Sequence, residues 1–578
     1  MKKYKLILPI TLLTTASGFL PFTSCSSRHY EMSDLTKEII TEMIGSQEDE
    51  QILGTCAIPH PSHHCQQIAA YLQRRIHQIL GEESVVHIDS YNNVWCDIQP
   101  NNPQNKSFDP IILQAHTDMV VAGMSEEESL TCGIKPEIKG KLMHAKGHKT
   151  SLGADNGIGI AAILKIMNQR SNFEHGLIRC IFTADEEVGL IGARNLSTDA
   201  LKSNGNFIPY LLNLDEEKAG RICRSCLGVF RDRYYKNYPE QNATPPFTNA
   251  IDLRIDNLKG GHSGLDIVLG RANADRIIFE FINYLIQKGV EVEIGAYDHV
   301  KKVDGQDVDI KWQSNQLIEN GRAIIYCNNC DESQVRTYLN QYLATLPSRY
   351  PGEDVNSWAT SVAAAAWHES NPYISVAETT NLAKLIGGNL ENSQDIGSQG
   401  FPYGVFDKSE EGKVNASGNI GPVVISDEEG TSKSLYLTIE LMYRTGLYGA
   451  EADPQPQDWS IGWSRPKYHQ ALEMCGMQDN VENIEIVQPW QSTPGVNDQM
   501  ILFLDQTFAQ MGIEHTIFDP QGTTEIAAWI TKNPSLICAS IGPTIDDAHT
   551  KKETLHLDTV DNYYNAILKT LAWVEKNN

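Results

Sequence analysis

Short apolar runs along this chain end in acidic or imidazole side chains. Strand-like runs of this kind cover residues 110–113, 177–183 and 210–214, and another apolar stretch covers residues 535–541. Brief apolar runs without alternation are typical of strands buried on both faces of a parallel sheet. Because parallel strands of an open α/β sheet present their carboxyl ends at one edge, the polar side chains that follow them are expected to meet there. The pattern predicts an α/β fold with a site at that edge.

Five polar strings supply the candidate site residues. The strings are Leu113-Gln-Ala-His116-Thr-Asp118, Gly153-Ala-Asp155-Asn-Gly157, Ala184-Asp-Glu186-Glu187-Val-Gly189, Leu212-Asn-Leu-Asp215-Glu-Glu217 and Ile541-Gly-Pro-Thr-Ile-Asp-Asp-Ala-His549. Imidazole nitrogen combined with carboxylate oxygen suits a borderline divalent cation such as zinc, and cobalt or manganese also fits. Each string alone is more often a solvated loop or a turn before a helix. Together they predict a hydrolase centre with two metal ions.

The chain resembles the aminoacyl-histidine (Xaa-His) dipeptidases, within the dizinc peptidase superfamily that includes tripeptide aminopeptidases and carnosinases. The strings that support this resemblance are Ile58-Pro-His-Pro-Ser-His-His64, Asn93-Val-Trp95, Leu113-Gln-Ala-His-Thr-Asp-Met-Val120, Leu152-Gly-Ala-Asp-Asn-Gly-Ile-Gly159, Phe182-Thr-Ala-Asp-Glu-Glu-Val-Gly-Leu190, Gly260-Gly-His-Ser-Gly-Leu-Asp266, Leu269-Gly-Arg-Ala-Asn273 and Ser540-Ile-Gly-Pro543. They span most of the chain after the first thirty or so residues. The resemblance implies a dizinc peptidase catalytic domain with an inserted α+β lid domain, and hydrolysis of short peptides, Xaa-His dipeptides in particular.

The resemblance assigns the metal ligands. His116, Asp155 and Asp215 would hold one zinc ion, and Asp155, Glu187 and His549 would hold the other. Asp155 would bridge the two. A shared carboxylate suits two ions roughly 3.5 to 4 Å apart, because it screens their repulsion and fixes their spacing.

The resemblance also assigns four catalytic or substrate-binding residues. Glu186, which is next to a ligand in sequence, would be the general base. Asp118 would accept the second ring N–H of the first histidine ligand and set its tautomer. His262, in the Gly-Gly-His-Ser-Gly string, would face the reacting carbonyl, and Arg444 would grip the peptide carboxylate. The ordinary alternatives are a glycine-rich turn for His262 and a solvent-facing strand arginine for Arg444.

Two strings depart from the family pattern. After His549 the family shows Ser-Pro-Asp-Glu, whereas this chain has Thr550-Lys-Lys-Glu553, and His556 competes for the ligand assignment. The ligand is assigned to His549 because it follows the apolar stretch and the Gly-Pro turn. Farther upstream, Gln521 stands where the family has a histidine, although Glu525 is retained, which puts substrate-amine binding there in doubt.

The positions of the ligand strings predict two domains. The 578-residue chain exceeds one ordinary domain, and the strings fall into one block that ends at Asp215 and another at His549. The intervening stretch therefore reads as an insertion. We expect the catalytic domain to comprise residues 34–218 and 489–578, and the lid to comprise residues 219–488. A helical pattern from about Gln499 to Phe508 would return the chain to the catalytic sheet.

The first 25 residues resemble a bacterial export signal. Lys2-Lys-Tyr-Lys5 precedes an apolar run over residues 6–22 that is short and interrupted by prolines, so a membrane span is not expected. A small residue before Cys25 resembles a lipoprotein cleavage site, although Phe22 is an imperfect match. We expect an exported protein, either periplasmic or anchored through lipid on Cys25. The alternatives are an ordinary signal peptide and, because relatives are generally cytoplasmic, a cytoplasmic protein.

The twelve cysteines leave the redox compartment open. Eleven remain without Cys25, an odd number that leaves at least one thiol unpaired within the chain. Two Cys-x-x-Cys pairs, Cys223/Cys226 and Cys327/Cys330, would permit a four-thiolate zinc site, but they lack compact spacing. Local disulfides or buried thiols are the favoured interpretation.

The net charge of the chain limits the classes of molecule that it is expected to bind. With 73 acidic and 47 basic residues the net charge is -26, which disfavours nucleic acid and suits small cationic or neutral substrates. Two alternatives to a dipeptidase stay open: a metal-dependent N-acyl amino acid deacylase, and a non-catalytic binding protein on the same scaffold. The complete ligand set with Glu186 favours an enzyme. The resemblance also implies a homodimer.

Overall fold

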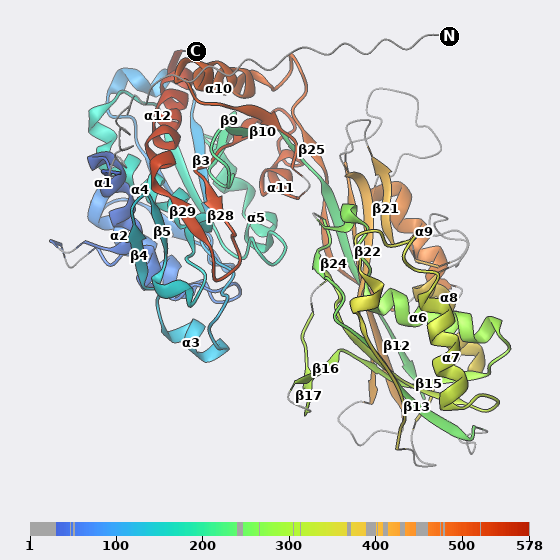
Figure 1. The fold of residues 1–578 in the computed structure, drawn as a ribbon. Helices are drawn as coiled ribbons and strands as arrows, with labels where there is room; N and C mark the ends of the chain where they lie inside the picture. Colours follow the sequence, from blue (N-terminus) through green and yellow to red (C-terminus); the bar gives the residue numbers. More distant parts are fainter. Residues whose placement is uncertain are drawn as a thin grey trace, which may run out of the picture.

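The structure, a computed structural model, describes residues 30–576 apart from residues 47, 50, 51, 240–246, 265, 304, 305, 313, 367–371, 389–399, 402, 409–413, 428–433, 447–460, 474, 475, 478, 479 and 521. The predicted export signal with Cys25, and Gln521, lie outside the described residues. Within the described ranges, no helix is both long enough and apolar enough to cross a bilayer. Two large sheets form two parts that lie side by side (Figure 1).

The first part is built on an eight-stranded sheet whose central strands are parallel. Its strands, in spatial order, are β1 (Val86–Ile88), β2 (Val94–Ile98), β6 (Ile178–Thr183), β3 (Ile111–His116), β9 (Tyr210–Asn213), β27 (Ile537–Ser540), β10 (Arg221–Cys223) and β26 (Thr516–Phe518). The helices on one face are α1 (Asp34–Ile44), α2 (Gln66–Leu80), α4 (Ala154–Gln169), α10 (Gln499–Gln510) and α12 (Val560–Lys576), and those on the other are α5 (Ile191–Asn195) and α11 (Ile526–Ile530). Every residue of β3, β6 and β9 is buried, as expected for strands covered on both faces.

These elements confirm the predicted strands and helix. The apolar runs predicted as strands correspond to β3, β6, β9 and β27, and the helix expected from Gln499 is α10. The pairs β6 with β3, β3 with β9 and β9 with β27 are all parallel. The carboxyl ends of these four strands therefore lie at one edge, where the polar strings follow them.

The second part is built on a nine-stranded antiparallel sheet. Its strands are β20 (Ala359–Ala364), β13 (Asn249–Asp256), β19 (Gly321–Cys327), β15 (Val292–Asp298), β22 (Val414–Asp427), β23 (Leu435–Thr445), β12 (Gly228–Tyr238) and β24 (Val481–Val487), with β21 (Gly404–Lys408) beside β22. Four helices, α6 (Ala274–Gln287), α7 (Glu332–Leu343), α8 (Val376–Gly387) and α9 (Ile461–Glu473), cover the face turned away from the first part (Figure 1). Apolar and polar residues alternate over most of β23 because only one of its faces packs under helices.

Short elements complete the fold. They are α3 (Glu126–Thr131), a four-stranded sheet of β28 (Ile545–Asp546), β29 (Thr554–His556), β5 (Leu142–Ala145) and β4 (Pro136–Lys139), and the two-stranded pairs β7 (Lys202–Ser203) with β8 (Asn206–Phe207), β14 (Gly261–His262) with β18 (Gln316–Leu317), β16 (Val300–Val303) with β17 (Gln306–Asp309), and β11 (Ser225–Cys226) with β25 (Trp490–Gln491).

The chain crosses between the two parts beside the β11–β25 pair. Strand β10 still belongs to the first sheet, where it pairs with β26 and β27, so the first crossing comes after Cys223. The boundary predicted after Lys218 is therefore too early, because three further residues complete the catalytic sheet. The return crossing lies between β24, which ends at Val487, and β25, which begins at Trp490.

Candidate metal centre

The five predicted ligands come together at the carboxyl edge of the first sheet. Nε2 of His116 lies 2.9 Å from Oδ1 of Asp155, and Nε2 of His549 lies 3.0 Å from Oδ2 of the same carboxylate. Asp215 adds an oxygen 3.2 Å from Nε2 of His116, and Glu187 adds one 2.8 Å from Nε2 of His549. The side chains thus form two groups of three that share Asp155. This is the arrangement expected of a carboxylate that bridges two cations.

The donor set fits divalent cations. Ligand atoms of His116, Asp155 and Glu187 lie within 4.8 Å of one another. Oε1 of Glu187 is buried and, although close to an imidazole, makes no directed hydrogen bond to any residue that the structure describes. Burial, together with the charge of Asp155, raises the pKa of Glu187 to about 7. Bound cations would remove this unfavourable crowding of buried carboxylates, so the residues suit the metals that the sequence predicts.

Glu553 holds the backbone that carries the bridging residue. Its carboxylate accepts the backbone N–H groups of residues 152–155 over 2.7 to 3.2 Å. Helix α4 begins at Ala154, and its first N–H groups have no partner within the helix. Glu553 is buried and supplies that missing cap from a distant part of the chain. It therefore fixes Asp155 at the positively polarised end of the helix.

Asp118 holds the loop that carries the predicted base. Its carboxylate accepts the backbone N–H of Glu186 at 2.8 Å, that of Glu187 at 3.2 Å, and the Ser62 hydroxyl at 2.8 Å. The carboxylate was expected to accept the ring N–H of His116, but Nδ1 lies 3.6 Å from it and 3.0 Å from the backbone oxygen of Asp118. Both the carbonyl and the carboxylate of Asp118 therefore face this side of the ring, and the role of Asp118 in setting the tautomer stays a prediction.

Glu186 lies within this acidic centre without an assigned ligand role. Burial raises the pKa of Glu186 well above its usual range, and the charges of Glu187 and Asp215 raise it further. A carboxyl group in such surroundings binds a proton more readily than an exposed glutamate does. The position suits a group that accepts and releases protons during catalysis.

Two lid residues lie together near the metal centre. Nη2 of Arg444 lies 3.4 Å from Nε2 of His262. The Gly264 N–H donates to Nδ1 of the same ring at 3.2 Å, which places the proton of a neutral imidazole on Nε2. Burial, Arg444 and the charge of His549 lower the pKa of His262 to about 3. A neutral ring N–H and a guanidinium therefore converge where an anionic group would be stabilised.

A row of polar side chains beneath the ligands was missed by the sequence reasoning. Gln114, Asn213 and Ser540 are neighbours on β3, β9 and β27. Ser540 donates to Asn213, and Nδ2 of Asn213 donates to Gln114 over 2.5 Å. Gln114 and Thr183 in turn donate to the buried carboxylate of Glu525, Thr183 over 2.9 Å. The row ties together the strands that carry the ligands. Strand periodicity offered a signal, because Gln114 shares a face with the histidine two positions later.

The structure does not support two alternatives that the sequence left open, His556 as a metal ligand and a four-thiolate zinc site. His556 lies on β29, and its Nε2 contacts Asp546 at 2.7 Å rather than the metal ligands. Across the described ranges, no group of cysteines has its sulfur atoms close enough together to hold a metal ion, so the Cys-x-x-Cys pairs build no four-thiolate site there.

Comparisons with known proteins agree with this architecture. The sequence model of the Peptidase family M20/M25/M40 matches residues 112–573. The chain is 24% identical over 533 residues to the cytosol non-specific dipeptidase of Escherichia coli (strain K12), a match that covers 89% of this chain and 95% of that protein. The crystal structure of aminoacylhistidine dipeptidase from Vibrio alginolyticus superposes with a TM-score of 0.63 at 23% identity, over 90% of this chain and 94% of that one.

A more distant structure shares the same fold. Aminopeptidase PepT from Bacillus cereus ATCC 10987 gives a TM-score of 0.50 at 14% identity, over 94% of this chain and 99% of that one. These matches confirm the predicted α/β catalytic fold with its inserted lid. On the strength of the family match, the chain belongs to the Peptidase family M20/M25/M40.

Proposed function

We propose that the protein is a metal-dependent dipeptidase with Xaa-His dipeptides as its preferred substrates. The observation that carries this proposal is the pair of imidazoles on the two oxygens of Asp155, with Glu186 beside the ligand Glu187. Two divalent cations, zinc in our proposal, would act there as Lewis acids that polarise the peptide carbonyl and acidify water. Glu186 takes a proton from the attacking water and delivers it to the amine nitrogen as the peptide bond breaks.

The lid supplies the other half of the proposed site. The Nε2–H of His262 donates to the oxyanion that develops on the scissile carbonyl. Arg444 keeps its positive charge at neutral pH, although burial lowers its pKa to about 10, and it pairs with the free carboxylate of the substrate. Its Nε has no hydrogen-bond partner among the described residues and is available to that carboxylate.

A deacylase that acts on N-acyl amino acids would use the same groups. Such a substrate also offers a carbonyl to His262 and a carboxylate to Arg444, so these contacts do not discriminate. Assays with Xaa-His dipeptides, other dipeptides, dipeptide amides and N-acyl amino acids separate the two activities. Dipeptidase activity predicts turnover of the first two classes, with weaker binding of the amides because they lack the carboxylate.

Glu186→Gln tests the proposed chemistry. The variant should retain both metals while turnover of the best dipeptide falls by on the order of 10² to 10⁴, because the amide cannot accept the proton. Metal analysis of the purified protein and steady-state kinetics measure the two effects. Near-normal turnover with full metal content would exclude Glu186 as the base, and no hydrolysis of any dipeptide by the metal-loaded protein would reject the dipeptidase function.

A further inference from the structure

Two cysteines lie opposite each other on adjacent antiparallel strands, away from the metal centre. Cys96 of β2 and Cys180 of β6 are register partners. Both side chains belong to the apolar core on the α1, α2 and α4 face, so they project from the same side of the sheet. Opposed residues in an antiparallel pair have Cα atoms about 4.5 to 5.5 Å apart, and a disulfide accepts about 4.4 to 6.8 Å. The backbone is therefore already placed for a bond between these sulfurs.

The two thiols also lie beside each other in the core. Burial raises the pKa of the Cys180 thiol well above its usual range, and the Cys96 thiol beside it raises it further. The pair is thus a dithiol inside the core, held by strands on either side. The sequence analysis did not find it, because 84 residues separate the two positions and no Cys-x-x-Cys spacing marks them.

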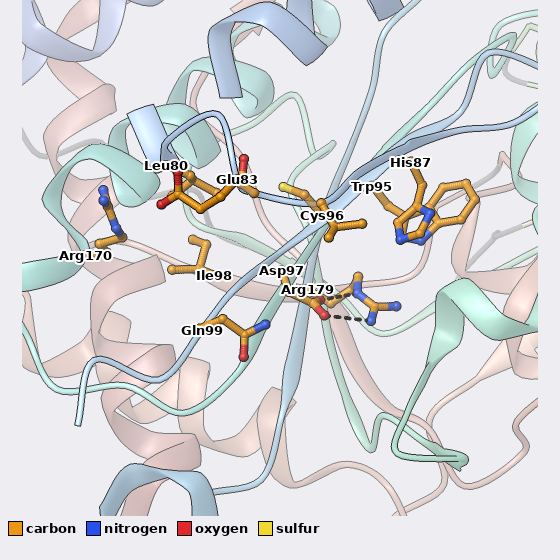
Figure 2. A pocket seen from close by; sticks show the side chains of 12 residues that line it. Leu80, Glu83, His87, Trp95, Cys96, Asp97, Ile98, Gln99, Arg170 and Arg179 are labelled. Carbon is orange, nitrogen blue, oxygen red and sulfur yellow. Dashed lines mark hydrogen bonds and ion pairs between the residues drawn. The ribbon is translucent and has the colours of Figure 1, made fainter. Parts of the chain in front are cut away.

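A hollow at the sheet edge gives an approach to Cys96. The hollow has a volume of about 540 Å³, and Cys96, Trp95, Asp97 and Arg179 contribute to its wall (Figure 2). Strand β1 begins at Val86, the partner of Cys96, so among the described strands nothing pairs with the outer edge of β2 farther along. Its wall holds none of the predicted metal ligands, so the hollow is distinct from the catalytic edge of the sheet.

We propose that Cys96 and Cys180 are a modification site that forms a cross-strand disulfide by exchange with a low-molecular-weight disulfide. The Cys96 thiolate attacks the oxidant, which releases one thiolate and leaves a mixed disulfide on Cys96. The Cys180 thiolate then attacks the Cys96 sulfur and displaces the second thiolate. The two cysteines lose two protons and two electrons, and the oxidant becomes two thiols. The bond fastens β2, the second strand from the edge of the sheet, to β6, which leads into the loop of the proposed base.

Peptide mapping of the full-length protein tests the proposal directly. The protein is incubated with oxidised glutathione, denatured, alkylated and digested, and a sample reduced with dithiothreitol serves as the reference. We expect a linked peptide that contains Cys96 and Cys180 only in the oxidised sample. Free alkylated Cys96 and Cys180 after oxidation would overturn the proposal, as would linkage confined to Cys223/Cys226 or Cys327/Cys330.

Thermal unfolding gives a second, independent readout. The disulfide closes a long loop, so the oxidised protein should unfold several degrees (~5 °C) above the reduced one. Cys96→Ala should abolish this difference. Cys56→Ala is the matched control, since Cys56 is equally buried and its thiol contacts the backbone oxygen of Leu152. If Cys56→Ala also abolished the difference in unfolding temperature between the oxidised and the reduced protein, the assignment of the disulfide to Cys96 and Cys180 would be contradicted.

Discussion

At the scale of single residues, the structure separates two histidines that the sequence left in competition. His549 has a left-handed backbone, with φ of 65°, in the loop between β28 and β29, and its ring reaches Asp155 and Glu187. His556 follows a few positions later, but it lies on β29 and its ring pairs with Asp546. The altered Thr550-Lys-Lys segment between them is exposed, which explains why it can differ from the family pattern without moving the ligand.

Replacing each histidine tests this separation. His549→Ala should lose one metal ion per chain and nearly all hydrolysis, because the second ligand group then keeps only two carboxylates. His556→Ala should retain both ions and change mainly stability. Metal content by mass spectrometry and dipeptide turnover measure the outcome. The reverse pattern would transfer the ligand role to His556.

Local residue chemistry indicated the strings that carry the candidate ligands but not the groups that support them. An imidazole or carboxylate after a buried strand is visible in one short string, as at His116 and Asp215. The contacts of Glu553 and Glu525 cannot be recognised in a short string, since their partners lie hundreds of positions away in the sequence. The same limit applies at Asp118, because only the folded loop defines which groups lie near its carboxylate and its carbonyl.

At the scale of elements, strand predictions succeeded where burial leaves a clear pattern. Strands β3, β6 and β9 are buried throughout, so their sequences are mostly apolar and easily recognised. The amino end of α4 is different, because Gly153 at its cap position has no side chain and the cap comes from Glu553. Sequence rules that look for a local capping residue can therefore indicate a helix start here but cannot identify its cap.

Glu553→Gln tests the long-range cap. The new amide NH₂ would face backbone N–H donors, so at least one donor at the start of α4 loses its partner. We expect the free energy of unfolding to fall by about 1 to 3 kcal/mol and metal affinity to fall with it, because Asp155 lies in the affected turn. Lys552→Gln, on the exposed part of the same loop, is the matched control.

Denaturant unfolding and metal titration measure the two effects of the Glu553 variant. The expected pattern is a joint loss in Glu553→Gln and unchanged values in Lys552→Gln. Unaltered metal affinity in a destabilised Glu553→Gln protein would show that the cap supports the helix but not the bridging residue.

At the scale of the whole molecule, the sequence predicted two domains and the insertion, and it misplaced one edge. The return crossing is marked by turn-forming residues around Pro489, which composition reveals. The first crossing has no such mark in the sequence. Strand β10 is only three residues long, and it is part of the sheet because it pairs with β26 and β27, which come some 290 residues or more later in the chain. A strand that is defined by distant partners leaves little local signal.

We also propose, at this scale, that the protein is exported and anchored through lipid on Cys25. The proposal rests on Lys2-Lys-Tyr-Lys5, the apolar run over residues 6–22 and the small residue before the cysteine.

If the protein is anchored through Cys25, the wild-type protein expressed in a bacterial host should fractionate with membranes. Cys25→Ser should move it to a soluble fraction, because the lipid attachment atom is removed. Cys132→Ser, which alters an exposed cysteine of the catalytic part, should stay with the membranes. Mass spectrometry of the mature amino terminus identifies the lipid directly. Recovery of an uncleaved chain in the cytoplasm would refute export, and membrane association that persists in Cys25→Ser would refute the anchor.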